Sequence, residues 1–372
     1  MKSVKNLNSQ ELMKSVIQRI ATGPELSKNI SRDEAKQAMR AILRGEVSEV
    51  RAAIFLIALR MKRETDDENL GVQDAINEEI KPKQVNAENL INIADPYDGY
   101  TRNVPSSVFV LPVLSELGYA CVSQGVESVG PKYGCTHHLI LKLLGLNVSA
   151  SLEQTADRLE DESIGWGYID QKIFAPKLFS LMNLRSEIIK RPLITTLEVL
   201  ANPLISKKNH FVTGFVHKPY PPIYLMLARN AGFDSSIVIR GTEGGIVPSL
   251  RQKSIFHFYR SPDDEDGSFE IDPINEFDIK QDARAVPLPA SISKEDKNDK
   301  IETKVDPMEV AKESLKQGID AIGGSPGIMR DCIAYCSAAI SSHVSGNDVK
   351  TCYKEITKIL DSGSALSRFK KI

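Results

Sequence analysis

Long apolar stretches are missing from this sequence. The longest unbroken apolar run, from Ala52 to Leu59, has an arginine on each side. A helix needs about 20 apolar residues to span a bilayer, so we expect no membrane-spanning segment. The opening stretch, residues 1–14, also has no apolar core of the kind that a signal peptide carries. These absences predict a soluble, cytoplasmic protein that does not act in a membrane.

Cysteine is scarce, and neither positive nor negative charge is in clear excess. The five cysteines are an odd number without CxxC spacing, which favours reduced thiols over a disulfide framework. The 47 lysines and arginines are balanced by 49 aspartates and glutamates, for a net charge of −2. Because the whole protein is not basic, any polyanion would have to bind to a local basic patch.

The first eighty or so residues carry the pattern of consecutive helices. Capping boxes at 31–34 and 65–68 predict two helix starts. Between them, apolar residues recur at spacings of three and four from Val50 to Met61, and Phe55 and Leu59 carry the apolar surface round the helix. Such a helix needs partners on more than one face. We therefore expect neighbouring helices on one side and a second subunit on the other, with Phe55 or Leu59 facing that subunit.

From about Asn89 onward, short β-prone runs alternate with helical segments. The runs are at 90–94, 120–124, 211–216, 236–240 and 255–259. This alternation predicts a largely parallel sheet covered by helices, and ligands bind such sheets at the carboxyl ends of the strands. We expect a helical domain over 1–88, with a helical return near 174–189, and an α/β domain over 89–372. A ligand site is expected in the cleft between them.

Several segments, taken in order, carry a pattern that covers nearly the whole chain. They are the helical segment 31–65, the triplet Phe-Ala-Pro at 174–176, Arg185, the stretches 191–196 and 200–203, and the closing DSGSAL at 361–366. In order and spacing they resemble the anthranilate phosphoribosyltransferase family, also called glycosyltransferase family 3. The resemblance implies an α/β protein with a small all-α domain, in a nucleoside phosphorylase/phosphoribosyltransferase-like fold with a mostly parallel sheet flanked by helices. It also implies a homodimer through the amino-terminal helices.

The loops that bind phosphoribosyl pyrophosphate in that family are altered here. The family's glycine-rich GTGGD loop is replaced by ADPYD at 94–98. Proline has no amide donor and tyrosine is bulky, so the backbone cradle for pyrophosphate cannot form in the same way. The basic KHGN loop is SQGV at 123–126 and keeps only Gly125. Ile246 and Val247 stand where the family has the acidic pair that holds magnesium, and one carboxylate, Glu243, remains nearby.

These replacements are similar to a second, bacterial branch of the family, which has been connected with nucleic-acid binding. The similarity lies in Tyr97, Gly99, Arg102 and the GTEG stretch at 241–244. It favours binding of a nucleic acid or a nucleotide-like polyanion over ordinary anthranilate chemistry. Phosphoribosyl or glycosyl transfer with an altered acceptor, using a phosphorylated small molecule, stays the alternative, and magnesium is expected only in that case. No catalytic residue is assigned and no metal site is expected.

The residues expected to contact the ligand follow from the strand ends and from the resemblance. They are Asp98, Gly99, Arg102, Asn103, Ser106, Ser107, Gly125, Arg185, Arg191 and Glu243, with Lys132, Lys177 and Lys190 as further cations of a polyanion patch. Arg185 corresponds to the family arginine that faces the acceptor's carboxylate, but a guanidinium suits an internal ion pair equally well. Glu243 suits either a ligand or the cap of the following turn.

Two further features each have a simple structural explanation. His137 and His138 follow Cys135, but neighbouring side chains on a helix point about 100° apart, so we do not expect them to share a metal ion. Trp166, between two glycines, is expected either as a hinge anchor between the domains or as a buried packing residue.

Overall fold

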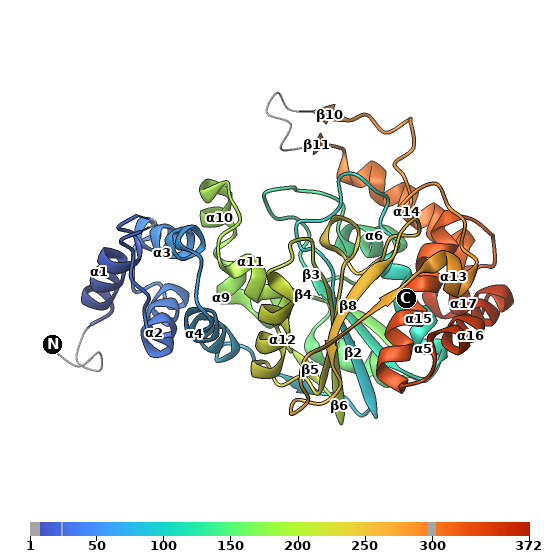
Figure 1. Cartoon of the computed structure of the whole chain (residues 1–372), viewed down its shortest axis with the longest axis horizontal. Helices are drawn as coiled ribbons and strands as arrows, with labels where there is room; N and C mark the ends of the chain where they lie inside the picture. Colours follow the sequence, from blue (N-terminus) through green and yellow to red (C-terminus); the bar gives the residue numbers. More distant parts are fainter. Residues whose placement is uncertain (1–7, 24, 297–302) are drawn as a thin grey trace.

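The computed structural model describes residues 8–23, 25–296 and 303–372. Four helices come first and form a bundle at one end of the molecule (Figure 1): α1 (Ser9–Ile20), α2 (Arg32–Leu43), α3 (Glu49–Lys62) and α4 (Asp66–Asn77). A side-chain oxygen caps the amino end of each helix, and the capping boxes predicted at Ser31 and Thr65 are confirmed. Among the described residues, no helix combines the length and apolar character needed to span a membrane.

Helix α3 has two apolar faces with different surroundings. Phe55, Leu56 and Leu59 are fully buried in the chain's own core, and helices α1 and α10 (Met182–Ile188) pack against α3. On the opposite face, the side chains of Val50 and Met61 are exposed to solvent, at 69% and 75%. The expectation that Phe55 or Leu59 faces a second subunit is therefore wrong, because both side chains are needed inside the bundle.

A seven-stranded sheet forms the centre of the second part of the chain. Its strand order is β4-β3-β2-β6-β7-β8-β9. The strands are β2 (Asn89–Ala94), β3 (Ala120–Gly125), β4 (Trp166–Asp170), β6 (Lys208–Gly214), β7 (Ser235–Ile239), β8 (Ser254–Tyr259) and β9 (Gly267–Ile271). The first five strands in spatial order are parallel to one another. At one edge of the sheet, β8 is antiparallel to β7, and β9 is antiparallel to β8. The predicted fold class is confirmed: a small helical part precedes an α/β part with a mostly parallel sheet flanked by helices.

Two short strand pairs lie outside this sheet. They are β1 (Lys83–Gln84) with β5 (Leu204–Ile205), and β10 (Glu295–Asp296) with β11 (Thr303–Lys304). The remaining helices are α5 (Val110–Glu116), α6 (His137–Leu144), α7 (Leu152–Glu160), α8 (Gln171–Phe174), α9 (Pro176–Phe179), α11 (Ile194–Leu197), α12 (Tyr220–Asn230), α13 (Pro273–Phe277), α14 (Pro307–Ile322), α15 (Ile328–Ser345), α16 (Val349–Ser362) and α17 (Ser364–Phe369). Thus α8, α9 and α10 occupy the segment where a helical return was expected.

The two faces of the sheet belong to two apolar cores. Side chains alternate between the faces along each strand, so Leu90 and Ile91 of β2 enter different cores. One core runs from the amino-terminal bundle through α12 to the sheet, and it contains Phe55 together with Phe211 of β6. The other lies under α5 and the carboxyl-terminal helices α14 to α17, which cover the right-hand side of the molecule in Figure 1.

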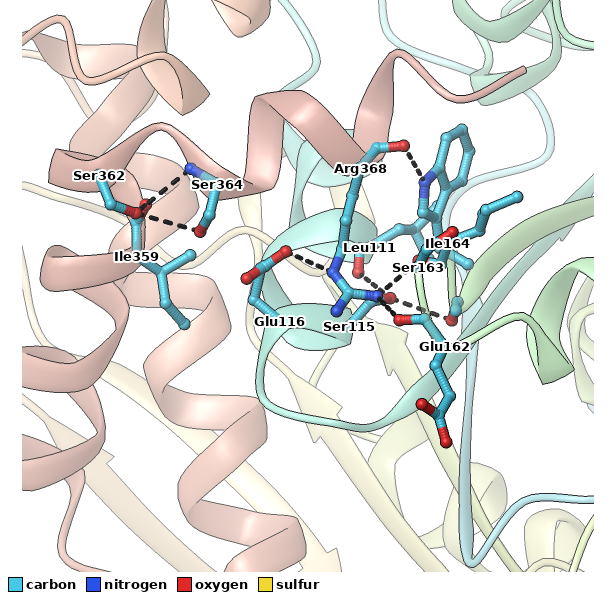
Figure 2. Close-up of polar contacts among 12 residues, drawn as sticks. Leu111, Ser115, Glu116, Glu162, Ser163, Ile164, Ile359, Ser362, Ser364 and Arg368 are labelled. Atoms are coloured by element: carbon cyan, nitrogen blue, oxygen red, sulfur yellow. Dashed lines mark hydrogen bonds and ion pairs between the residues drawn. The ribbon is translucent and has the colours of Figure 1, made fainter.

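Helix α17 is fixed to the β4 edge of the sheet by Arg368. Its guanidinium is paired with Glu116 and donates to the carbonyls of Glu162 and Ile164, at 2.7 and 3.2 Å (Figure 2). The indole nitrogen of Trp166 donates back to the Arg368 carbonyl at 3.2 Å, and the indole stacks on Phe369. Trp166 is completely buried. Of the two roles considered for it, the structure supports packing and not a hinge.

Candidate functional site

The loops that follow β2, β3, β6 and β7 meet at the carboxyl edge of the sheet. A bridge between Tyr100 and Cys135 joins the loops after β2 and β3, and a bridge between Gly241 and Pro248 closes the loop after β7 on itself. The loop after β7 also packs on the loop after β2. The contact is so close that a side chain in place of Gly245 would collide with the hydroxyl of Tyr100. The place where the sequence predicts a site is therefore a compact set of interlocked loops.

Two tyrosines fill the interior of the loop that follows β2. The Tyr97 hydroxyl donates to Oε1 of Gln124 at 2.9 Å, and the Tyr100 hydroxyl donates to Oδ2 of Asp95 at 2.8 Å. Both rings are buried, and burial raises the pKa of both phenols well above the usual value. Their hydroxyls stay protonated and act as structural donors. The interior of the loop after β2 is thus occupied by the loop's own side chains.

Behind Tyr100 lies a buried chain of hydrogen bonds. The Ser107 hydroxyl donates to Asp95 at 2.5 Å and lies 2.8 Å from Nε2 of His137, whose Nδ1 is 2.7 Å from the Ser123 hydroxyl. Burial alone would raise the pKa of Asp95, but the hydrogen bond and the charge of His137, together with Ser107 and Tyr100, hold that pKa below its usual range. The Asp95 carboxylate also accepts from the Ile246 amide at 3.0 Å, so it organises the loops after β2 and β7.

Several residues expected at the ligand lie inside this arrangement. Ser106, Ser107 and Gly125 are buried. Gly99 has a φ of 73° and contacts the backbone of Gly134 so closely that any side chain would collide there. The predicted ligand contact of these four residues is not supported, because they shape the interior of the loops and offer no surface.

A mixed cluster of charges lies at the entrance to these loops. Asp98 is paired with Arg191 and, through its Oδ1 atom, lies 3.2 Å from Nζ of Lys132. The Lys132 ammonium is also 3.9 Å from the Glu243 carboxylate, which accepts from the backbone amide of the exposed residue Arg102. The structure therefore brings together Asp98, Arg102, Lys132, Arg191 and Glu243, which come from four segments.

Glu243 has a role that neither sequence interpretation anticipated. Its φ is 54°, and its carboxylate accepts from the amides of Thr101 and Arg102 at 3.1 and 2.9 Å and from the Asn103 side chain at 3.0 Å. No side-chain bond caps the turn that contains it. Glu243 and Asn103 thus hold the loop after β7 against the loop after β2.

Arg185 is not available to a ligand as expected. Its guanidinium makes a two-pronged ion pair with Glu198, at 2.6 and 2.7 Å, and both side chains are almost fully buried. Gln171 also donates to Glu198, at 3.2 Å. Of the two roles considered for Arg185, the internal ion pair is the one formed. The sequence feature that could have indicated this partner is Glu198, which is the one charged residue in the stretch 192–200.

The remaining predicted cations divide between two places. Lys177 pairs with Glu79, just beyond the end of α4, at 2.6 Å, so it ties α9 to the helical bundle. Lys190 is exposed and directly precedes Arg191 at the end of α10. The polyanion patch proposed from the sequence is therefore reduced to Arg102, Lys132, Lys190 and Arg191.

Next to this cluster the structure has an open cavity of about 570 Å³. Its walls are the loop after β3, the carboxyl end of α10 and the segment that enters α14. The cavity is lined by, among others, Ser128, Gly130, Lys132, Tyr133, Arg185, Ser186, Ile189 and Lys304. The sequence analysis missed Tyr133, Ile189 and Lys304. An aromatic residue directly after Lys132 was the one signal that could have marked this loop.

The loops do not fit magnesium. The Glu243 carboxylate already accepts three hydrogen bonds, and Ile246 and Val247 are buried apolar residues. Over residues 8–23, 25–296 and 303–372, no group of three or more histidines, cysteines, aspartates or glutamates is placed to hold a metal ion. His137 and His138 point to different partners, Ser107 and Asp170.

Comparison with known proteins agrees with this fold. Residues 14–79 match the model of the glycosyl transferase family, helical bundle domain. The chain is 34% identical over 220 residues to an uncharacterized protein of Aquifex aeolicus, covering 59% of this chain and 65% of that protein. It is 27% identical over 178 residues to the anthranilate phosphoribosyltransferase of Thermus thermophilus, covering 48% and 53%. With the anthranilate phosphoribosyltransferase of Aquifex aeolicus it shares 24% identity over 365 residues, 97% of both chains. In the first two comparisons the match spans less than two thirds of the relative.

Solved structures show the same architecture. Anthranilate phosphoribosyltransferase from Thermus thermophilus superposes with a TM-score of 0.69 at 19% identity, covering 96% of this chain and 98% of that one. The Saccharomyces cerevisiae enzyme, in complex with PRPP and Mg, gives 0.73 at 14% identity, covering 96% and 95%. The fold is therefore that of phosphoribosyltransferases that join a helical bundle to an α/β part. The chain is anthranilate phosphoribosyltransferase-like, and residues 14–79 are similar to the helical bundle domain of the glycosyl transferase family.

Proposed function

We propose that this chain binds a polyanion, either a nucleic acid or a nucleotide-like molecule, in the cleft beside its strand-end loops, and that it does not transfer phosphoribosyl groups to anthranilate. One observation carries the proposal. Lys132 and Arg191 converge on Asp98 at the mouth of the loops, and Tyr97 and Tyr100 fill the interior of the loop after β2.

The filled interior argues against the transferase alternative. Transfer from phosphoribosyl pyrophosphate needs donors or metal ions that neutralise the pyrophosphate as it leaves. The backbone of the loop after β2 is covered by Tyr97 and Tyr100, and the loop after β7 lacks the acidic pair for magnesium. A transferase with an altered acceptor would still need these groups, so binding without this transfer is the simpler function.

The mouth of the loops suits phosphate groups. Arg191 and Lys132 share the Asp98 carboxylate, which shows that the site already holds an anionic group between two cations. A phosphate carries more negative charge than a carboxylate and accepts from planar guanidinium groups in the same geometry. Lys190 and Arg102 are exposed on either side and extend the positive surface beyond this pair.

The proposal predicts a steep dependence of binding on salt. With four cations engaged, the logarithmic slope for a single-stranded oligonucleotide should be about −3, because each neutralised phosphate contributes about −0.7. Replacing Lys132 and Arg191 together by alanine should flatten the slope by about 1 to 2 and weaken binding for every sequence alike. The measurement is fluorescence anisotropy of labelled oligonucleotides of increasing length, each titrated at several salt concentrations.

A matched variant controls for the loss of net charge. Lys354 and Lys358 lie on α16, on the opposite side of the molecule in Figure 1, and replacing both by alanine should leave affinity and slope close to those of the wild type. A slope near zero, or affinity that does not rise with oligonucleotide length, would contradict nucleic-acid binding and point to a compact site for one small phosphorylated molecule.

We also propose that the exposed apolar face of α3 pairs with the same face of a second copy. Val50, Ile54 and Met61 are exposed along one side of this helix, and contiguous exposed apolar residues mark interaction surfaces. In an isologous interface one substitution acts twice. Ile54→Asp should therefore give monomers in analytical ultracentrifugation, while Lys354→Ala should not. A wild-type protein that sediments as a monomer at micromolar concentration would exclude this dimer.

A further inference from the structure

Two residues with unfavourable backbone conformations line the same cavity. Tyr133 has a φ of 50° and Ile189 has a φ of 67°, both in the left-handed region. This region disfavours residues with a side chain, and a β-branched isoleucine is a clear outlier there. Such conformations persist where the surrounding structure imposes them, often at ligand sites. Here two separate segments adopt this unfavourable conformation, and both line the same cavity.

The strained backbone presents apolar side chains to solvent. Tyr133 is 47% exposed and Ile189 is 67% exposed, although burial would stabilise both. Exposed apolar residues are common one at a time, but here they line a cavity together with cations. The arrangement therefore offers an incoming molecule an aromatic ring and an aliphatic side chain at once.

The Tyr133 ring has a fixed position. It lies directly on Gly130, because a side chain at that glycine would come within 2.8 Å of the Tyr133 hydroxyl and 2.9 Å of the adjacent ring carbon. The backbone is held on both sides of the ring, since the Tyr133 amide donates to the Val129 carbonyl at 3.3 Å and the Gly134 amide donates to the Asp98 carbonyl at 2.9 Å. A ring that packs against Gly130 and is exposed elsewhere can stack with a flat ligand, and little side-chain entropy is lost because the ring is already held in place.

The polar groups around the ring suit phosphate and sugar. Lys132 and Lys304 approach the cavity from different segments, and Ser128 and Ser186 contribute hydroxyls. The volume of about 570 Å³ lies within the range of about 300 to 1,000 Å³ that is usual for small-molecule sites. A stacking ring flanked by lysines is the combination by which proteins bind single-stranded nucleic acids without strong sequence preference.

We propose that this cavity receives one unpaired nucleobase of a single strand, stacked on Tyr133 and packed against Ile189, with the flanking phosphates at Lys132 and Lys304. The inference rests on the proposed function and narrows it from polyanions in general to strands whose bases are free to stack. A base pair inside a duplex does not expose its flat faces, so duplexes should use only the cations of the site.

The test compares three labelled probes of equal length by fluorescence anisotropy: dT12, a 12-unit abasic strand, and a 12-base-pair duplex. Wild-type protein should bind dT12 about tenfold more tightly than the abasic strand. Tyr133→Ala should weaken dT12 binding by up to about tenfold, toward the affinity of the abasic strand, and leave the affinity for the abasic strand unchanged. Tyr133→Phe should bind dT12 like the wild type, because it keeps the ring. Thermal melting of each variant checks that the fold is intact.

The outcomes separate this inference from the function on which it rests. Equal affinity of the wild type for dT12 and the abasic strand, or equal losses for both probes in Tyr133→Ala, would overturn base stacking and leave polyanion binding standing. Failure of all three probes to bind would overturn both base stacking and nucleic-acid binding, and would leave a nucleotide-like small molecule as the ligand to test. Competition with thymidine 5′-monophosphate separates the two sources of a base: displacement of dT12 at equal concentrations of competitor and strand would assign the cavity to free nucleotides and overturn the strand proposal.

Discussion

Replacing Glu198 by alanine is expected to destabilise the fold by about 3–5 kcal/mol, because the change leaves the buried guanidinium of Arg185 without its partner. The pair is almost fully removed from water, with side-chain exposures of 3% for Arg185 and 0% for Glu198. Nε of Arg185 already has no hydrogen-bond partner, so little remains in the surroundings that could compensate. Urea unfolding followed by circular dichroism measures the loss.

A double variant distinguishes a broken ion pair from general damage to the core. Arg185→Met combined with Glu198→Leu removes both charges and keeps similar volume, and it should recover stability to within about 1 kcal/mol of the wild type. A single Glu198→Ala variant that loses less than about 1 kcal/mol would show that the ion pair is not formed as described. Activity or binding tests cannot replace this measurement, since an unfolded variant would lose both.

Incubation with anthranilate, phosphoribosyl pyrophosphate and magnesium should yield phosphoribosyl anthranilate at least ~10³-fold more slowly than a related enzyme does. Loss of a single donor to a developing negative charge costs about 10²–10³-fold, and under the proposed function the glycine-rich loop, the basic loop and the acidic pair are all replaced in this chain. In the structure, hydrogen bonds hold Tyr97 and Tyr100 inside the loop after β2.

The matched reference is the anthranilate phosphoribosyltransferase of Aquifex aeolicus, since the match covers 97% of both chains. Both proteins are assayed by the fluorescence of the product under the same conditions. A rate within tenfold of the reference would contradict the prediction and favour the transferase alternative. Growth of a tryptophan auxotroph with this chain as its sole source of the activity would do the same.

The fold could be predicted from the sequence because its signals are local. Each capping box and each β-prone run is contained within a few consecutive residues, and the helices after Ser31 and Thr65 and the five predicted strands appear where they were expected. The sheet edges were missed. Strand β4 contains Gly167, which weakens a strand pattern, and β9 lies in a polar, charged stretch.

The site was predicted less well because its chemistry depends on distant partners. Asp98, Lys132 and Arg191 were identified by their place at strand ends, but their mutual pairing joins residues far apart in the chain. Two roles stayed open for Arg185, because the sequence contains Glu198 as a candidate partner but does not show that the two side chains meet. Exposure and positive φ of Tyr133 and Ile189 are set by tertiary structure, and the residue types alone do not indicate them.

The core that joins the helical bundle to the sheet has a consequence for motion. Apolar residues of α3 and α4 continue without interruption into the face that contains β2 and β6, and Gln73 of α4 donates to the Leu227 carbonyl of α12 at 2.9 Å. Parts of a chain move freely against each other when the contact between them is small and polar, which is not the case here. Opening a hinge at this junction would expose apolar surface to water. The apolar junction therefore opposes a hinge motion between the helical bundle and the sheet.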